Sequence, residues 1–437
     1  MNKIFTLTTR KIAGNTLYQL IGKVFTLGVT VFITYMITNH YGREDYGGFS
    51  LMQNFPGLLF VITDFGLNAI SVREATKNES RLYHYFINVL VFRIFLSLLF
   101  IIFLSVLLYF FPYSATLKLG IRLSLFLILT FSLFTSTNII FQTKLRYDLS
   151  SISQIVGYLF IILLSVFLID RHASIVWLSF SYVIGGFITF LVGWIFIQRL
   201  DISKEFFLDF RLIKSLFKES LPLGIMFVFS QMSFKEDSIL LSILRIPSWL
   251  NLNSSEVVGI YSLPYKIFEV SLVIPTFVMN SVYPFLVEHF EEGASRFILS
   301  FKRTLLFLFV SGVVVGVFGV IFAPLIIKIF GVSEFAFSVP ILRILMGGVF
   351  IFFLTQPVSW FLVILRSQKF LPRVYLISAV LNLVLNLVFI PIYSFYAAAV
   401  ITLVTELVIF TMLCFYSYKA WNSRENKDNS ALQKAYV

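Results

Sequence analysis

The sequence predicts an all-α polytopic membrane protein with twelve transmembrane helices in two six-helix lobes, related by a pseudo-two-fold axis along the membrane normal. Hydrophobic residues make up 58% of the 437 residues, whereas an average soluble domain contains about 45–50%. Twelve apolar stretches are each long enough to cross the roughly 30 Å hydrocarbon core of a bilayer. In addition, residues of the first half recur in the second half at a nearly constant spacing.

Short polar gaps separate the twelve apolar stretches. The run that follows Arg10 and Lys11 is longer than a signal-peptide core and lacks a small-residue cleavage site, so we expect it to remain as the first helix. The expected spans are 14–38, 46–71, 84–110, 119–142, 150–169, 174–198, 219–244, 257–286, 303–327, 336–364, 371–390 and 393–418.

Lysine and arginine residues determine the expected topology. The chain has a net charge of +12. At the two ends and in the even-numbered gaps we count 23 Lys and Arg residues, against six in the odd-numbered gaps. The positive-inside rule then places both termini in the cytoplasm, which requires an even number of spans. The basic excess is therefore a topology signal, and no nucleic-acid partner is expected.

A polar stripe occurs in the first predicted helix and again 212 positions later in the seventh. Its members are three or four residues apart, so each stripe lies on one helix face. The paired residues are Gln19, Lys23, Thr26 and Thr30 in the first helix, and Gln231, Lys235, Ser238 and Ser242 in the seventh. A lysine at membrane depth usually faces a cavity or a partner, so two matching lysines predict a polar central cleft between two parallel repeats.

The repeat and the polar segments predict four parts of the chain. Residues 1–200 form an N-terminal six-helix lobe and residues 219–420 a C-terminal one. Charged and aromatic residues interleave in the cytoplasmic linker 201–218, which predicts an amphipathic helix at the membrane interface. The cytoplasmic tail 421–437 is polar, and we expect it to be disordered.

Other ionisable residues at membrane depth have structural interpretations. Lys266 and Glu269 are three apart on one helix and are expected to pair. Asp237 points away from the polar stripe and is expected to tie the seventh helix to its own lobe. Lys23 either contacts the substrate or pairs with Asp64 on the next helix.

The sequence contains no phosphate-cradling glycine motif, nucleophile elbow or metal-ligand cluster, so we expect a transporter without cofactor or metal, and no enzymatic activity. The single cysteine, Cys414, lies in the last span and excludes an internal disulfide.

Several short motifs resemble one family of transporters over nearly the full length of the chain. In this order and spacing, they resemble the Wzx-type O-antigen flippase branch of the multidrug, oligosaccharidyl-lipid and polysaccharide exporter superfamily. The motifs are Tyr-Gly-Arg-Glu-Asp-Tyr-Gly at 41–47, Asp-Phe-Gly-Leu at 64–67, Leu-Pro-Leu-Gly at 221–224, Asp-Ser-Ile-Leu-Leu at 237–241, Gly-Ile-Tyr-Ser at 259–262 and Ile-Pro-Ile-Tyr at 390–393.

The resemblance implies a flippase of the bacterial inner membrane, active in O-antigen or related lipopolysaccharide biosynthesis. It would move an undecaprenyl-pyrophosphate-linked oligosaccharide from the cytoplasmic to the periplasmic leaflet by alternating access, alongside a polysaccharide polymerase and a chain-length regulator. Lys23 and Lys235 would hold the pyrophosphate, and the other six stripe residues would face the sugars. A separate hypothesis is that Asp64 or Glu406 couples transport to a proton or sodium gradient.

Two alternatives remain. A multidrug cation exporter of the same superfamily would need an acidic cleft, which the two stripe lysines disfavour. A membrane O-polysaccharide polymerase would resemble its relatives in having a large periplasmic loop, and the longest external gap here is only about 245–256.

Overall fold

The structure is a computed structural model that describes residues 2–205, 207–331 and 334–435, without the side chains of 2–13, 15–16, 233 and 425–435. Its elements in these ranges are helices, as the sequence predicts. Ten helical segments of the described chain are long and apolar enough to cross a membrane. The predicted count of twelve stays a prediction.

The first two predicted spans lie in one long helical segment, Leu17–Lys77, of 61 residues. Its main part, α1 (Asn2–Asp64), is broken at Gly42, which has φ 77° and ψ −172°. Glycine adopts this backbone conformation without the steric cost of a side chain. The break falls in the gap between the predicted spans 14–38 and 46–71, so Gly42 redirects the chain there.

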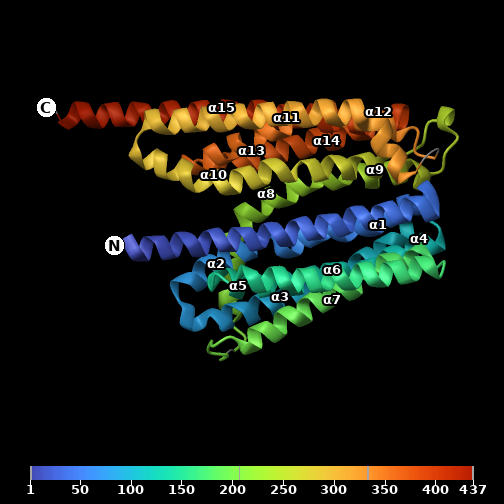
Figure 1. The fold of residues 1–437 in the computed structure, drawn as a ribbon, viewed down its shortest axis with the longest axis horizontal. Coiled ribbons are helices and arrows are strands. Elements are labelled where there is room, and N and C mark those ends of the chain that lie inside the picture. The colour runs from blue at the N-terminus through green and yellow to red at the C-terminus, as the bar shows by residue number, and fades with distance from the viewer. Residues whose placement is uncertain (1, 206, 332–333, 436–437) are drawn as a thin grey trace. The chain divides into compact units, whose positions relative to one another are not determined.

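The first compact unit comprises Met1–Gln231 and Asn253–Gly259. Within it, α6 packs against α1 and α7, and α5 packs against α3 and α7 (Figure 1, blue to green). Apolar side chains such as Leu67, Phe86 and Phe141 are fully buried in its core. Its helices after α1 are α2 (Leu67–Lys77), α3 (Leu82–Leu107), α4 (Ala115–Ser124), α5 (Phe126–Thr143), α6 (Tyr147–Asp170), α7 (Ile175–Arg199) and the first part of α8 (Phe210–Ile243).

The second compact unit comprises Met232–Leu252 and Ile260–Val437. Here α11 packs against α12 and α13, and α15 packs against α13 and α14 (Figure 1, yellow to red). A Cβ atom on Gly316 of α11 would lie 2.7 Å from the carbonyl oxygen of Met346, so glycine allows this close helix contact. Its helices after α8 are the rest of α9 (Ser254–Ser271) from Ile260 onward, α10 (Val273–Glu292), α11 (Ala294–Phe330), α12 (Ser338–Gly347), α13 (Val349–Ile364), α14 (Leu371–Tyr393) and α15 (Phe395–Ala435).

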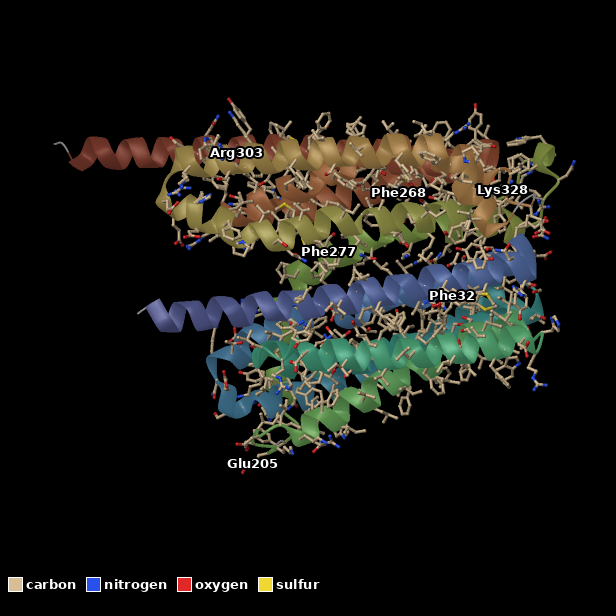
Figure 2. The ribbon with its side chains drawn as sticks, in the orientation of Figure 1. Phe32, Glu205, Phe268, Phe277, Arg303 and Lys328 are labelled. Carbon is tan, nitrogen blue, oxygen red and sulfur yellow. The ribbon has the colours of Figure 1, made fainter. Side chains whose placement is uncertain are left out.

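The outer face of α11 shows how such a helix would fit a bilayer. Arg303 lies nine residues after the start of α11 and Lys328 two residues before its end (Figure 2), and about 37 Å of helix separates them. More than half of the surface of eight apolar side chains between them is exposed: Leu306, Phe307, Val310, Val314, Val317, Phe318, Ile321 and Leu325. An exposed apolar band of this length, bounded by cations, matches the roughly 30 Å hydrocarbon core with its interfaces.

The linker between the predicted lobes differs from expectation. Residues 201–205 and 207–209 are not helical, so the predicted amphipathic helix is wrong there, and helix starts only at Phe210. Asp209 Oδ1 accepts hydrogen bonds from the backbone N–H groups of Leu212 and Arg211, both at 3.0 Å. These bonds lower the pKa of the Asp209 carboxyl and begin α8 at this point, as an N-cap does.

The C-terminal end also differs from expectation. α15 continues to Ala435, past residue 421, where the sequence predicts a disordered tail. No glycine or proline interrupts residues 395–435, so nothing in the backbone stops the helix. The side chains of the predicted tail from residue 425 onward lie outside the described residues.

Candidate functional site

The polar stripe of α1 has an accessible part and a buried part. Gln19 and Lys23 are exposed, whereas Thr26 is buried and Thr30 is half-buried. The two threonine hydroxyls bond to their own helix: Thr26 Oγ1 donates to the Lys23 carbonyl at 3.0 Å, and Thr30 Oγ1 donates to the Thr26 carbonyl at 2.8 Å. Lys23 and Gln19 are therefore the members of this stripe that a ligand reaches most directly.

The matching stripe on α8 has the same gradient. Gln231 and Lys235 are half-buried, whereas Ser238 and Ser242 are buried. The Ser242 hydroxyl donates to the carbonyl of Ile239 at 2.6 Å. The lysine and the glutamine are again the accessible members of the stripe.

Lys235 is part of a three-residue charge cluster in the second unit. Its Nζ donates to Glu269 Oε1 at 2.8 Å, and Lys266 Nζ donates to Glu269 Oε2 at 3.2 Å. The predicted Lys266–Glu269 pair is thus confirmed, but Lys235 was not expected to share the carboxylate. The exposed side-chain fractions are 21% for Lys235, 23% for Glu269 and 38% for Lys266. This cluster, which we call the lysine–glutamate triad, carries two positive charges and one negative charge.

Asp237 lies two residues further along α8 but is sealed inside the unit, with 1% of its surface exposed. Its Oδ2 accepts hydrogen bonds from the Tyr261 hydroxyl at 2.7 Å and from Thr402 Oγ1 at 3.0 Å. Its Oδ1 accepts one from Asn386 Nδ2 at 2.7 Å. Because these partners lie on α9, α14 and α15, the prediction that Asp237 ties the seventh helix to its own lobe is confirmed.

Other polar side chains are buried on the same helices. Glu236 Oε2 and Asn386 Oδ1 are buried without a hydrogen-bond partner among the described residues. Asn382 lies one turn before Asn386 on α14 and bonds to it at 2.7 Å. Glu406 is buried on α15, one turn after Thr402. An oxygen-lined site with open acceptors suits a proton or a hard monovalent cation.

Sequence reasoning missed the two asparagines of this site. The available signal was their spacing: two amides four residues apart share one face of an otherwise apolar helix. Among the described residues, no group of three or more His, Cys, Asp or Glu side chains is arranged to hold a metal ion.

Asp64 has a different partner from the one that the sequence suggested. Arg93 is completely buried; its Nη2 donates to Asp64 Oδ1 at 2.6 Å and its Nη1 donates to Ser136 Oγ at 3.0 Å. Asp64 is the last residue of α1. The helix is interrupted after it by Phe65 and Gly66, which have φ values of 43° and 72°. The sequence suggested Lys23 as the partner of Asp64 and did not point to Arg93. Asp64 instead compensates the charge of the buried Arg93 guanidinium, which is a structural role.

Two repeat-related glycines make a close backbone contact within the first unit. A Cβ on Gly47 would lie 1.8 Å from the carbonyl oxygen of Ser255. A Cβ on Gly259 would lie 1.9 Å from the carbonyl oxygen of Arg43. Arg43 also donates from Nε and Nη2 to Glu256 Oε1, at 2.9 and 2.7 Å. Since Gly259 follows Gly47 by the repeat spacing of 212, the same part of each repeat contributes to this contact.

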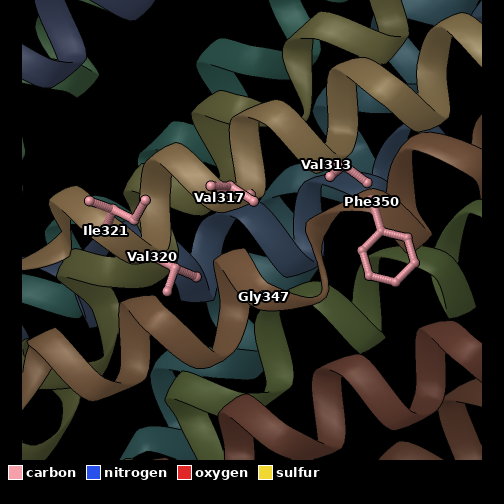
Figure 3. Close-up of a pocket in the computed structure, with 7 residues that line it drawn as sticks. Val313, Val317, Val320, Ile321, Gly347 and Phe350 are labelled. Carbon is pink, nitrogen blue, oxygen red and sulfur yellow. The ribbon is translucent and has the colours of Figure 1, made fainter.

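An apolar pocket of about 280 Å³ lies between α11 and the junction of α12 and α13 (Figure 3). It contains no polar side chain that could bind a phosphate or a sugar, so it is separate from the candidate site. Its lining residues are Val313, Gly316, Val317, Val320, Ile321, Gly347 and Phe350.

Apolar helices with exposed hydrocarbon-facing sides, together with ionisable groups at membrane depth, define a multi-pass membrane protein of the transporter class. The chain belongs to the polysaccharide biosynthesis protein family, whose family model matches residues 9–290. A second family model, MatE, matches residues 239–388. The resemblance to polysaccharide transporters predicted from the motifs is therefore confirmed.

Three solved structures share the fold. The lipid II flippase MurJ in an inward closed conformation is 18% identical and covers 92% of this chain and 87% of its own, with a TM-score of 0.69. An inward-facing multidrug resistance MATE family transporter of the MOP superfamily is 14% identical, with coverage of 91% and 96% and a TM-score of 0.74. A MOP superfamily transporter from Pyrococcus furiosus, described by the reverse polarity of its binding pocket, is 14% identical, with coverage of 94% and 96% and a TM-score of 0.61. No curated protein sequence matches the chain.

Proposed function

We propose that this protein is a flippase that moves an undecaprenyl-pyrophosphate-linked oligosaccharide from the cytoplasmic to the periplasmic leaflet of a bacterial inner membrane. The lysine–glutamate triad is the observation that carries this proposal, because it offers net positive charge on partly exposed side chains. The buried acids Glu236, Asp237 and Glu406 are each at most 6% exposed. An exporter of cations would need the reverse: accessible acids and no accessible lysines.

In this proposal Lys23 and Lys235 hold the pyrophosphate, and the other stripe residues contact the sugars. Pyrophosphate is an anion that ammonium groups bind through charge-assisted hydrogen bonds. The stripe residues that would face sugar hydroxyls are Gln19, Thr26, Thr30, Gln231, Ser238 and Ser242. A polysaccharide polymerase and a chain-length regulator would act on the product in the same membrane.

We further propose twelve spans in two six-helix lobes, 1–200 and 219–420, with both termini in the cytoplasm. The segment Leu17–Lys77 would form two spans. Its 61 residues correspond to about 90 Å of helix, which is enough for two crossings of a hydrocarbon core of roughly 30 Å and for the turn at Gly42 between them. α8 would be the seventh span, since it has 34 residues. These two changes raise the ten apolar segments to twelve.

The function is tested by removing the protein from its bacterium. We expect lipid-linked repeat units to accumulate with their glycans accessible only from the cytoplasm, and surface polysaccharide to be lost. A membrane-impermeant glycosidase, applied to spheroplasts and to inverted vesicles, measures the side on which the glycan lies. Glycans that reach the periplasmic side at the normal rate without the protein would contradict the proposal.

Alternating access also requires a closed state on one side, and the Gly47–Gly259 contact supports such a closure. It would lie at the periplasmic ends of the second and eighth spans if the termini are cytoplasmic. The Arg43–Glu256 ion pair, with side-chain exposures of 28% and 18%, would fasten the same contact. We propose that this contact opens when the sugar is released.

Gly47→Ala tests the closure. Because the clash would be with a backbone carbonyl, no side-chain rotation can relieve it, and we expect export to fall at least about tenfold with normal protein abundance. Gly57→Ala is the matched control, because it lies on the same helix and a Cβ there would meet nothing within 4 Å among the described residues. In a Cys414→Ser background, Ser255→Cys should react faster with an impermeant maleimide when Gly47→Ala is present. Equal export by both alanine variants would reject the closure.

The buried oxygen site around Asp237 supports the coupling of transport to a monovalent cation, H⁺ or Na⁺. The Asp237 carboxylate on α8 accepts hydrogen bonds from an amide N–H and two hydroxyls on three other helices, so occupancy by a cation would change how α8 packs against them. Sequence reasoning proposed Asp64 or Glu406 for this role. Glu406 belongs to the same buried region, whereas Asp64 is engaged by Arg93.

Asp237→Asn keeps the size of the side chain and removes its charge. We expect the variant to fold and to lose its response to an imposed gradient, with the coupled rate falling roughly tenfold to a hundredfold. Export of lipid-linked glycan in proteoliposomes, with a Na⁺ or a H⁺ gradient imposed in turn, identifies the ion. Glu406→Gln and Asp64→Asn are compared in the same assay. A full gradient response in Asp237→Asn together with a lost response in Glu406→Gln would move the site to Glu406.

A further inference from the structure

We propose that Glu269 is an internal stand-in for the anionic group of the substrate. Its carboxylate holds Lys235 and Lys266 in the empty protein and moves to the hydroxyl of Tyr265 when a pyrophosphate binds. This inference rests on the proposed function, because it assigns Glu269 a role in the same anion site.

The charge balance of the triad is the first step. Each oxygen of Glu269 takes one ammonium, at 2.8 Å for Lys235 and 3.2 Å for Lys266. A pyrophosphate that entered while Glu269 stayed in place would bring at least two further negative charges against two positive ones. Like charges at such distances repel strongly away from bulk water. The carboxylate must therefore leave the lysines for the pyrophosphate to take its place.

Accessibility is the second step. In the structural pair of Arg93 and Asp64, the guanidinium has no exposed surface, although the Asp64 side chain is 22% exposed. The three side chains of the triad, in contrast, are 21–38% exposed. Glu269 lies 15 residues after the start of α9 at Ser254, which corresponds to about 22 Å along the helix. Charged side chains that stay exposed at such a depth face a water-filled cavity rather than lipid.

The third step of the argument is that the displaced carboxylate needs another hydrogen-bond donor nearby. Tyr265 precedes Glu269 by four residues on α9, so the two side chains are neighbours on one helix face. The Tyr265 hydroxyl is buried and has no hydrogen-bond partner among the described residues. A buried hydroxyl without a partner is unfavourable, so Tyr265 offers Glu269 a hydrogen bond that the empty state does not use.

This exchange has a consequence for release. After the substrate has crossed, Glu269 can return from Tyr265 to the lysines and compete with the pyrophosphate for them. The carboxylate therefore lowers affinity and raises the rate of release. A transporter needs both effects, because a site that binds its cargo too firmly does not turn over.

Binding of farnesyl pyrophosphate to the purified full chain in nanodiscs tests the exchange. Glu269→Gln should bind about tenfold more tightly than wild type and release the ligand more slowly, the effect of removing one competing like charge. Tyr265→Phe should bind several-fold more weakly, and it should have no effect in the Glu269→Gln background, because the two act as one unit. Glu292→Gln, which breaks surface pairs with Arg296 (2.8 Å) and His289 (4.0 Å), should bind as wild type does. Farnesol, which lacks the anion, should not distinguish the variants.

Other outcomes separate this inference from the proposed function. If Lys235→Ala weakens binding but Glu269→Gln leaves it unchanged or weaker, the anion site stands and the exchange is overturned. If Lys235→Ala binds as wild type does, both are overturned. Should Glu269→Gln fail to fold, as judged by gel filtration, Glu269→Asp replaces it. Its shorter side chain should not bridge both lysines and should bind more tightly, so unchanged affinity in Glu269→Asp and in Tyr265→Phe would overturn the exchange.

Discussion

Replacing Lys235 by alanine is expected to abolish most glycan export. A charge-assisted hydrogen bond from an ammonium to a phosphate contributes about 1.5–3 kcal/mol, so its loss should slow export roughly tenfold to a hundredfold. Arginine should restore part of the activity, because it keeps the charge but presents a larger planar fork. If Lys23 contacts the same pyrophosphate, the effects of Lys23→Ala and Lys235→Ala should be coupled rather than additive.

The ion pair of Lys235 with Glu269 provides a control that separates a structural role of Lys235 from substrate binding. Lys235→Ala also removes one partner of a carboxylate at membrane depth, so a purely structural role would appear as lower protein abundance. Adding Glu269→Gln removes the uncompensated charge and should restore abundance without restoring export. Export by the well-expressed Lys23→Ala, Lys235→Ala double variant at the wild-type rate would end the pyrophosphate proposal. Recovery of export by Lys235→Ala, Glu269→Gln would show that Lys235 only neutralises Glu269.

Removing Asp64 is expected to have the largest effect on stability. Arg93 is completely buried, and its Nε already lacks a partner among the described residues. Asp64→Ala would leave only the Ser136 hydroxyl to solvate a positive charge inside the protein. Breaking a buried ion pair in this way costs about 3–5 kcal/mol, so we expect most of the protein to be lost from the membrane.

The double variant Asp64→Asn, Arg93→Met removes both charges and should return protein abundance toward the wild-type level. Membrane abundance is measured by immunoblotting, and thermal stability by gel filtration after heating. The same variants test the proposal that Asp64 couples transport to an ion. An Asp64→Asn protein with normal stability and a lost gradient response would favour coupling. A destabilised protein whose export recovers together with its abundance in the double variant favours the structural role.

Some features of the candidate site could be read from local patterns. Lys266 and Glu269 are three residues apart, so their pairing follows from helix geometry alone. The apolar spans likewise follow from composition over about 20 residues. The family could be recognised because its motifs keep their order along the chain. Each of these signals lies within one helix or within one short stretch.

Other predictions failed because capping and helix continuity depend on single hydrogen bonds and on the absence of breakers. The amphipathic pattern of 201–218 suggested one helix, yet the Asp209 cap starts the helix at Phe210. The polar composition of 421–437 suggested disorder, yet α15 continues to Ala435. The composition of a segment indicates whether its surroundings are polar or apolar, but it does not indicate at which residue a helix begins or ends.

By itself, the sequence determined the all-helical membrane fold, the family and the lysines that the proposed function depends on. Only the tertiary structure decided which partner each ionised group has: Glu269 for Lys235, Arg93 for Asp64, and Asn386 with Thr402 for Asp237. The physical reason is that hydrophobic periodicity specifies which face of a helix is polar but not which neighbouring helix it meets. At membrane depth that neighbour decides whether a charge is a sealed structural contact or an accessible binding group.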